Sequence, residues 1–136
     1  MTTAPVDRDA DVLACFHAYE EALADNDIDA MNHWFSAGDS VVRFGVGEEQ
    51  WGGGAVRLWR RTANPVRPGR TRSETRVTWC GEDVAVVSTL FHYPDQQDLG
   101  RQSQVWQRAG DSWQIVHAHV SMRAATGADT ARAEDR

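Results

Sequence analysis

The feature that most constrains the fold of this chain is a run of four β patterns in its second half. Residues 71–80, 83–93, 100–108 and 112–123 have the apolar content and alternation of strands, and short segments rich in Gly, Asp and Pro separate them. Connections this short join neighbouring antiparallel strands as hairpins. We therefore predict an antiparallel meander that makes up most of one sheet.

Helical patterns precede the meander. Apolar residues at offsets of 4, 3 and 4 mark one face of a first helix that ends near residue 26: Val12, Phe16, Tyr19 and Leu23. We expect Asp9 or Asp11 to cap this helix and Glu20 to lie on its solvent side. Further elements are predicted as a helix over 28–35, a strand over 40–45 and a helix over 55–61.

This order of elements indicates an α+β fold in which a curved antiparallel sheet and three N-terminal helices form a cone. Where strand side chains do not fill the cone, its interior becomes a pocket. The length of 136 residues suits one domain. We predict that this domain spans residues 9–123, between disordered segments over 1–8 and 124–136.

The composition restricts the classes of function. A net charge of −6 gives no general attraction to nucleic acid or to anionic membranes. All fourteen basic residues are arginine, so no lysine is available for Schiff-base chemistry. We find no signal peptide, membrane-spanning run or cofactor motif, and we expect a cytoplasmic protein without a cofactor. Cys15 and Cys80 match no metal or redox spacing and are expected to be buried, reduced thiols.

Arg43 is the most informative single residue. It lies in an apolar strand pattern, on the same face as Val41 and Gly45. A buried guanidinium needs a carboxylate partner, which is either internal, from Glu48 or Glu49, or part of a bound ligand. Because arginine binds carboxylates through two parallel hydrogen bonds, we expect a small anionic molecule in the pocket.

Tyr19 lies on the inner face of the first predicted helix. It is either a core tyrosine whose hydroxyl is satisfied internally or a hydrogen-bond donor and general acid that points into the pocket.

The third β pattern carries polar side chains on one face, at Gln102 and Gln104, together with Trp106. This face is a polar cavity wall, a solvent-exposed surface or a wet dimer interface.

Counting by two along the last pattern places five side chains on one face, namely Trp113, Ile115, His117, His119 and Ser121. His119 is a candidate for proton transfer or substrate binding, with a purely structural role as the alternative. His117 and His119 lack the spacing of a zinc site, and only His92 or scattered acids could add a third ligand, so no metal site is predicted.

Four ordered segments resemble a known family, at residues 19–27, 42–45 with Glu48, 100–106 and 113–121. They are similar to the AtzH-like branch of the nuclear transport factor 2-like superfamily. That superfamily also includes ketosteroid isomerases and SnoaL-like cyclases, and the branch contains the HpxZ proteins of oxalurate catabolism. The resemblance implies a cone-shaped homodimer with Tyr19 and Arg43 in its active site. Trp51 and His117 replace residues that are often tyrosine and a small residue in the branch.

The resemblance and the residue patterns together favour a cofactor-independent decarboxylase or related lyase that acts on a small carboxylated urea or amide-like acid. We expect Tyr19, Arg43 and His119 to be catalytic. The expected substrate-binding residues are Glu48, Trp51, Gln102, Gln104, Trp106, His117 and Ser121. Two alternatives stay open: an isomerase, dehydratase or cyclase of a biosynthetic pathway, and a non-catalytic accessory protein of an amidohydrolase.

Overall fold

The structure of the chain is a computed structural model that describes residues 7–129. Its helices are α1 (Arg8–Asp25), α2 (Ile28–Trp34) and α3 (Gly53–Arg60), and its strands are β1 (Val42–Phe44), β2 (Glu49–Trp51), β3 (Thr71–Trp79), β4 (Val84–His92), β5 (Leu99–Ala109) and β6 (Ser112–Arg123). The predicted disorder of residues 1–6 and 130–136 lies outside the described residues. Residues 124–129, expected to begin the disordered tail, are described, with 127–129 helical.

Aspartate side chains define where the first two helices begin. The carboxylate of Asp7 accepts a hydrogen bond of 3.2 Å from the Ala10 amide, so α1 is capped there, and the predicted caps at Asp9 and Asp11 are wrong. Both of those residues instead lie in the first turn, where their negative charge favours the helix dipole. Asp27 caps α2 in the same way, with 3.1 Å to the Ala30 amide.

The strands form one sheet in the order β2-β1-β6-β5-β4-β3, which confirms the predicted α+β class and the C-terminal meander. Every pairing in the sheet is antiparallel except that of β1 with β6, which is parallel. The sequence pattern did not predict β2, because it is only three residues long and glycines flank it.

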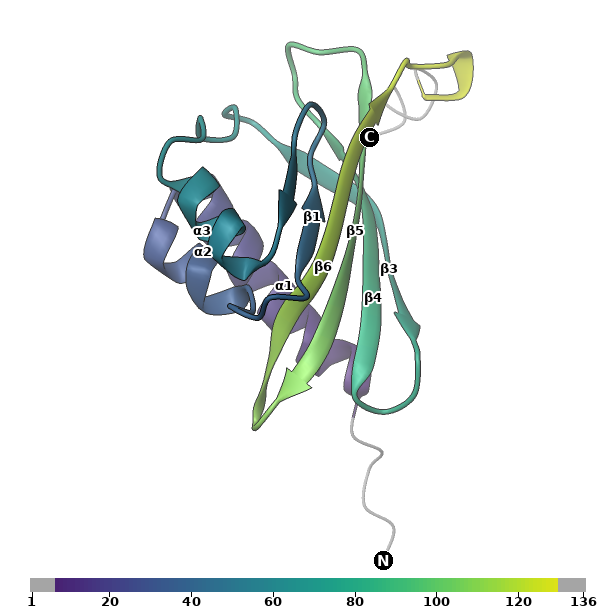
Figure 1. The fold of residues 1–136 in the computed structure, drawn as a ribbon. Helices are drawn as coiled ribbons and strands as arrows, with labels where there is room; N and C mark the ends of the chain where they lie inside the picture. The colour runs from purple at the N-terminus through teal and green to yellow at the C-terminus, as the bar shows by residue number, and fades with distance from the viewer. Residues whose placement is uncertain (1–6, 130–136) are drawn as a thin grey trace, which may run out of the picture.

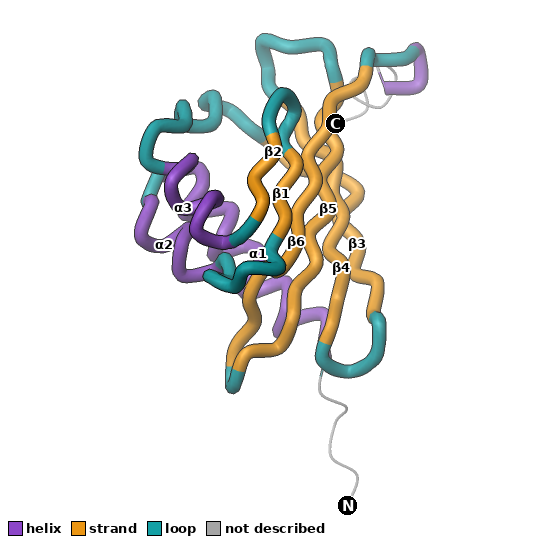
Figure 2. Tube along the Cα trace, viewed as in Figure 1, coloured by secondary structure: helices purple, strands orange, loops and turns teal. Residues whose placement is uncertain are grey.

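Helices α1, α2 and α3 cover one face of the curved sheet, and none of these three lies on the opposite face, here called the open face (Figures 1 and 2). The core lies between the helices and the sheet. Its fully buried side chains include Phe16 of α1, Phe35 after α2, and Trp106 and Ile115 of the central strands. Burial of these large apolar groups supplies the main driving force for this packing.

A β-bulge in β6 changes which residues face the helices. Val105 pairs with His117 and Trp106 pairs with Ile115, so Val116 is an extra residue in the ladder. The prediction that His117, His119 and Ser121 share a face with Trp113 and Ile115 is therefore wrong. Beyond the bulge the buried residue is Ala118.

The two cysteines are both free, and they differ in exposure. Cys15 is partly buried, and that burial raises the pKa of its thiol. Cys80 is exposed, so the prediction that it is buried is wrong. Within residues 7–129, no helix has both the length and the apolar character needed to cross a membrane.

Gly100 of β5 lies directly opposite Phe91 of β4, and this pair generates a prediction about stability. A Cβ atom at Gly100 would lie only 2.2 Å from atoms of the Phe91 ring. Gly100→Ala therefore has to displace a buried aromatic ring. We expect the free energy of unfolding to fall by about 1–3 kcal/mol, measured by urea denaturation.

Gly54→Ala is the matched control, because Gly54 lies in α3 and a Cβ atom there would meet no atom within 4 Å. This change should leave stability equal or raise it by up to about 1 kcal/mol. Equal effects of the two substitutions would contradict the proposed contact between Gly100 and Phe91.

Candidate functional site

A cavity of about 120 Å³ lies between the helices and the helix-covered face of the sheet. For comparison, an apolar cavity of about 150 Å³ in another protein binds benzene, so this one suits a ligand of similarly small size. Apolar side chains from α1, α2 and the loop before β3 form part of its wall. The polar part of the wall consists of Tyr19, Asn26, Arg43, Arg60, Asn64, Arg70, Tyr93, Gln102 and Gln104.

Arg43 reaches the cavity from β1 and has an internal partner, one of the two possibilities considered above. Its Nη1 atom donates to Oε1 of Glu48 and to Oε1 of Gln50, both at 2.8 Å. The guanidinium also lies 3.9 Å from the centre of the Trp59 ring, in a cation–π contact. Glu48 thus holds Arg43 without lining the cavity itself.

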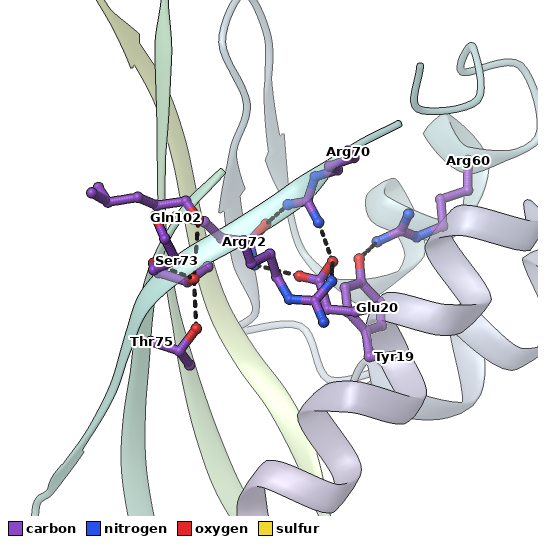
Figure 3. Close-up of polar contacts among 10 residues, drawn as sticks. Tyr19, Glu20, Arg60, Arg70, Arg72, Ser73, Thr75 and Gln102 are labelled. Carbon is purple, nitrogen blue, oxygen red and sulfur yellow. Dashed lines mark hydrogen bonds and ion pairs between the residues drawn. The ribbon is translucent and has the colours of Figure 1, made fainter. Parts of the chain in front are cut away.

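Glu20 forms the centre of a buried ion-pair network between α1 and the sheet (Figure 3). Its Oε2 atom pairs with Arg70 and lies 3.5 Å from Nη1 of Arg72, and its Oε1 atom accepts from Nε2 of Gln102 at 3.0 Å. The Glu20 side chain is 1% exposed, so its expected place on the solvent side of the helix is wrong.

The signal that could have located Glu20 is its spacing of four residues from Phe16. A helix face that packs on a sheet is wide enough to include both i+3 and i+4 neighbours. Tyr19 and Glu20 therefore both lie on the buried side of α1, and Arg70 is the partner that makes burial of the carboxylate possible.

Tyr19 lies next to Glu20 on α1 and contacts a different arginine. Its hydroxyl oxygen accepts a hydrogen bond from Nη2 of Arg60, as Figure 3 shows. Arg60 is 5% exposed and was not foreseen as a site residue. Its spacing of four residues from the buried Val56 on α3 is the signal that indicates an inward position.

Gln102 and Gln104 of β5 are buried and line the cavity, as a polar wall requires. Trp106 lies deeper, fully buried in the core, and does not line the cavity. Its Nε1 donates to Oε1 of Gln104 at 3.0 Å, so Trp106 holds the glutamine amide in place.

Besides Glu48 and Trp106, four more of the expected site residues do not line the cavity, namely Trp51, His117, His119 and Ser121. Trp51, His117 and His119 surround the Phe44 ring, with ring centroids 5.5 to 6.1 Å apart. Ser121 accepts from Nε of Arg101 at 3.2 Å in an exposed contact. The bulge at Val116 is the reason that the two histidines lie on the open face.

The described part of the chain has no cluster of side chains suited to binding a metal ion. No group of three His, Cys, Asp or Glu side chains that could hold a metal ion occurs within residues 7–129. The chemistry available to the cavity is that of guanidinium groups, amides and the phenols of Tyr19 and Tyr93. These groups can bind a small anion and can donate a proton or hydrogen bond to it.

Two solved structures are similar to this chain in both sequence and fold. A cystatin-like fold protein from Burkholderia xenovorans LB400 is 46% identical, with a TM-score of 0.85 over 89% of this chain and 95% of its own. A DUF3225-family protein of unknown function from Pectobacterium atrosepticum SCRI1043 is 36% identical, with a TM-score of 0.82 over 88% of this chain and 94% of its own.

A nuclear transport factor 2-like protein from Cytophaga hutchinsonii ATCC 33406 has a TM-score of 0.69 at 16% identity, over 88% of this chain and 100% of its own. At this identity the likeness concerns the fold alone. The overall architecture is thus of the nuclear transport factor 2-like type. Among curated protein sequences, none is significantly similar to this chain.

The AtzH-like family model matches residues 5–126, which is nearly the whole chain. That range includes every residue that lines the cavity and the Glu20 network beside it. The chain belongs to the AtzH-like family.

Proposed function

We propose that the protein is a cofactor-independent decarboxylase, or a related lyase, that acts on a small carboxylated urea or amide-like acid. The observation that carries this proposal is the presence of three guanidinium groups and two phenols, those of Tyr19 and Tyr93, in the wall of a 120 Å³ cavity. A cavity of this size and charge suits a small carboxylate better than a large apolar substrate.

Arg43 is the proposed anchor for a substrate carboxylate. Its Nη1 atom is bound to Glu48 and Gln50, and the planar guanidinium rests against Trp59. These contacts fix the orientation of the group before a ligand arrives, which lowers the entropy lost on binding. Gln104, held by Trp106, is positioned to orient the urea or amide part of the substrate.

The proposed reaction breaks the bond between a substrate nitrogen and its carboxylate carbon. The electron pair of that bond stays on the nitrogen, carbon dioxide leaves, and the hydroxyl proton of Tyr19 moves to the nitrogen. Apolar wall residues such as Leu23 and Phe35 would surround the leaving carboxylate. Its loss of hydration in such surroundings favours release of neutral carbon dioxide. His119, on the open face, has no part in this scheme.

The two alternative functions have less support from the site. Trp59 and Phe91 line the cavity, but the exposed Trp51 does not enlarge its apolar surface, which disfavours a bulky biosynthetic substrate. Arg43 has an internal acid partner, which a non-catalytic accessory protein would also have, yet it lines an open cavity. The small cationic pocket therefore favours the decarboxylase proposal.

Tyr19→Phe removes the proposed proton donor and keeps the ring that packs on Phe35. We expect kcat to fall by about 100-fold or more, with a small change in KM, because general acid catalysis contributes roughly 10²–10⁴ in rate. The measurement is carbon dioxide release from ureas that carry one or two N-carboxylates.

Arg43→Ala removes the proposed anchor, and KM for the same substrates should rise by about 30-fold or more through loss of a charge-assisted bond pair. Arg76→Ala is the control, because the Arg76 side chain is 80% exposed on β3. Wild-type turnover by both Tyr19→Phe and Arg43→Ala would disprove the proposed function.

A homodimer is the proposed assembly state, as the family resemblance implies. The open face carries the cluster formed by Phe44, Trp51, His117 and His119, with Val46 nearby. Trp51 is 67% exposed and Val46 is 63% exposed. Such large apolar groups in contact with water favour coverage by a second copy of the chain.

Trp51→Glu should therefore weaken the dimer, because a carboxylate without a partner is costly to bury. Light scattering on the eluting protein should give the mass of two chains for the wild type and of one chain for this variant. Leu58→Glu is the matched control, since Leu58 is 65% exposed on α3 and lies away from the open face. A wild-type mass of one chain, or equal behaviour of the two variants, would argue against this interface.

A further inference from the structure

Arg60 differs from the other arginines of the cavity in having no acidic partner. Arg43 pairs with Glu48, and Arg70 pairs with Glu20. Among residues 7–129, no carboxylate lies within ion-pair distance of Arg60, although this side chain is one of the most buried cations in the protein. Its Nε atom is buried and has no hydrogen-bond partner in the described part of the chain.

The guanidinium of Arg60 lies 5.0 to 5.5 Å from the ring centres of Tyr19, Phe35 and Trp59, and it donates two hydrogen bonds. Nη1 donates to the sulfur of Met31 at 3.1 Å, and a thioether is a weak acceptor. Nη2 donates to the hydroxyl oxygen of Tyr19, which is the strong contact of this side chain. A buried cation without a counter-charge is unfavourable unless it stabilises a charge that forms later. Among residues 7–129, the one oxygen to which Arg60 donates a hydrogen bond is that of Tyr19.

We propose that Arg60 is a positioning residue for Tyr19. A guanidinium only donates hydrogen bonds, so in this pair the phenol oxygen must be the acceptor. The hydroxyl hydrogen of Tyr19 is then free for a second partner, and both residues line the cavity where a ligand would be. Arg60 thereby presents that hydrogen to the ligand.

The lack of a carboxylate partner for Arg60 among residues 7–129 allows this side chain a second role toward Tyr19. When Tyr19 gives its proton to the substrate nitrogen, the electron pair of the O–H bond stays on the phenol oxygen as a negative charge. Arg60 then lies beside a phenolate with its full positive charge, because no carboxylate competes for it. Water that enters after carbon dioxide has left returns the proton to Tyr19. This inference rests on the proposed role of Tyr19 as the proton donor.

A double-mutant cycle tests whether Arg60 acts through Tyr19. We expect Arg60→Gln to lower kcat by about 100-fold, with KM changed less than about threefold, because the lost interaction forms mainly as charge develops. In the Tyr19→Phe background, the same change should cost no further activity. An equal loss of activity in both backgrounds would show a merely structural role and overturn the inference.

Arg60→Lys keeps the positive charge without the planar fork and should retain more activity than Arg60→Gln. Arg61→Gln is the control, since Arg61 is the exposed neighbour at the end of α3. Circular dichroism and thermal melting show whether each variant is folded. If Arg60→Gln does not fold, Arg60→Lys takes its place in the cycle, and additive losses there count against the inference.

A spectroscopic measurement needs no substrate. The chain has only two tyrosines, Tyr19 and Tyr93, so labelling with [¹³Cζ]tyrosine gives two resonances, and Tyr19→Phe assigns them. Arg60→Gln should move the Tyr19 resonance, whereas Arg61→Gln should move neither. An unmoved Tyr19 resonance would disprove the contact.

These outcomes separate the inference from the proposed function. Full turnover by Tyr19→Phe would remove the proton-donor role while the spectra could still show the Arg60–Tyr19 contact. Loss of turnover by Tyr19→Phe with full turnover by Arg60→Gln would contradict the inference alone.

Discussion

The buried carboxylate of Glu20 is the interaction on which the geometry of the site depends. With 1% of its side chain exposed, its oxygens must find partners within the protein, and they do so at Arg70, Arg72 and Gln102. These partners come from the start of β3 and from the middle of β5, so the network ties α1 to two separate strands. Tyr19 is the adjacent residue on α1, and its position over the cavity follows from this attachment.

The arginines that line the cavity differ in whether a carboxylate balances their positive charge. Arg43 and Arg70 are each held by a carboxylate, so their charges are largely balanced and they serve as oriented donors. Arg60 donates to a phenol and a thioether and lies near aromatic rings, and no carboxylate among residues 7–129 pairs with it, so its charge is left unbalanced. In surroundings that exclude water such a charge acts strongly on nearby groups, which gives the Arg60–Tyr19 side of the pocket a different chemistry from the Arg43 side.

The sequence predicted the elements with long, regular patterns and missed the features set by distant contacts. The meander and the inward position of Arg43 follow from alternation that extends over several residues. Glu20 was expected in solvent because its partners are 50 and 82 residues away at Arg70 and Gln102, and the helix pattern carries no information about them. The parallel pairing of β1 with β6 was missed for the same reason: short strands do not specify their neighbours.

The extra residue at Val116 has a consequence for how a pocket of this kind can diverge. Because one inserted residue reverses the two sides of the strand beyond it, Ala118 faces the helices while His117 and His119 face away. Loss of Val116 itself would give a regular ladder in the present register, so Ala118 would still face the helices. The imidazoles would turn toward the ligand only if every residue stayed and β6 paired without the bulge. The bulge, and not any single side chain, therefore keeps histidine out of the cavity wall.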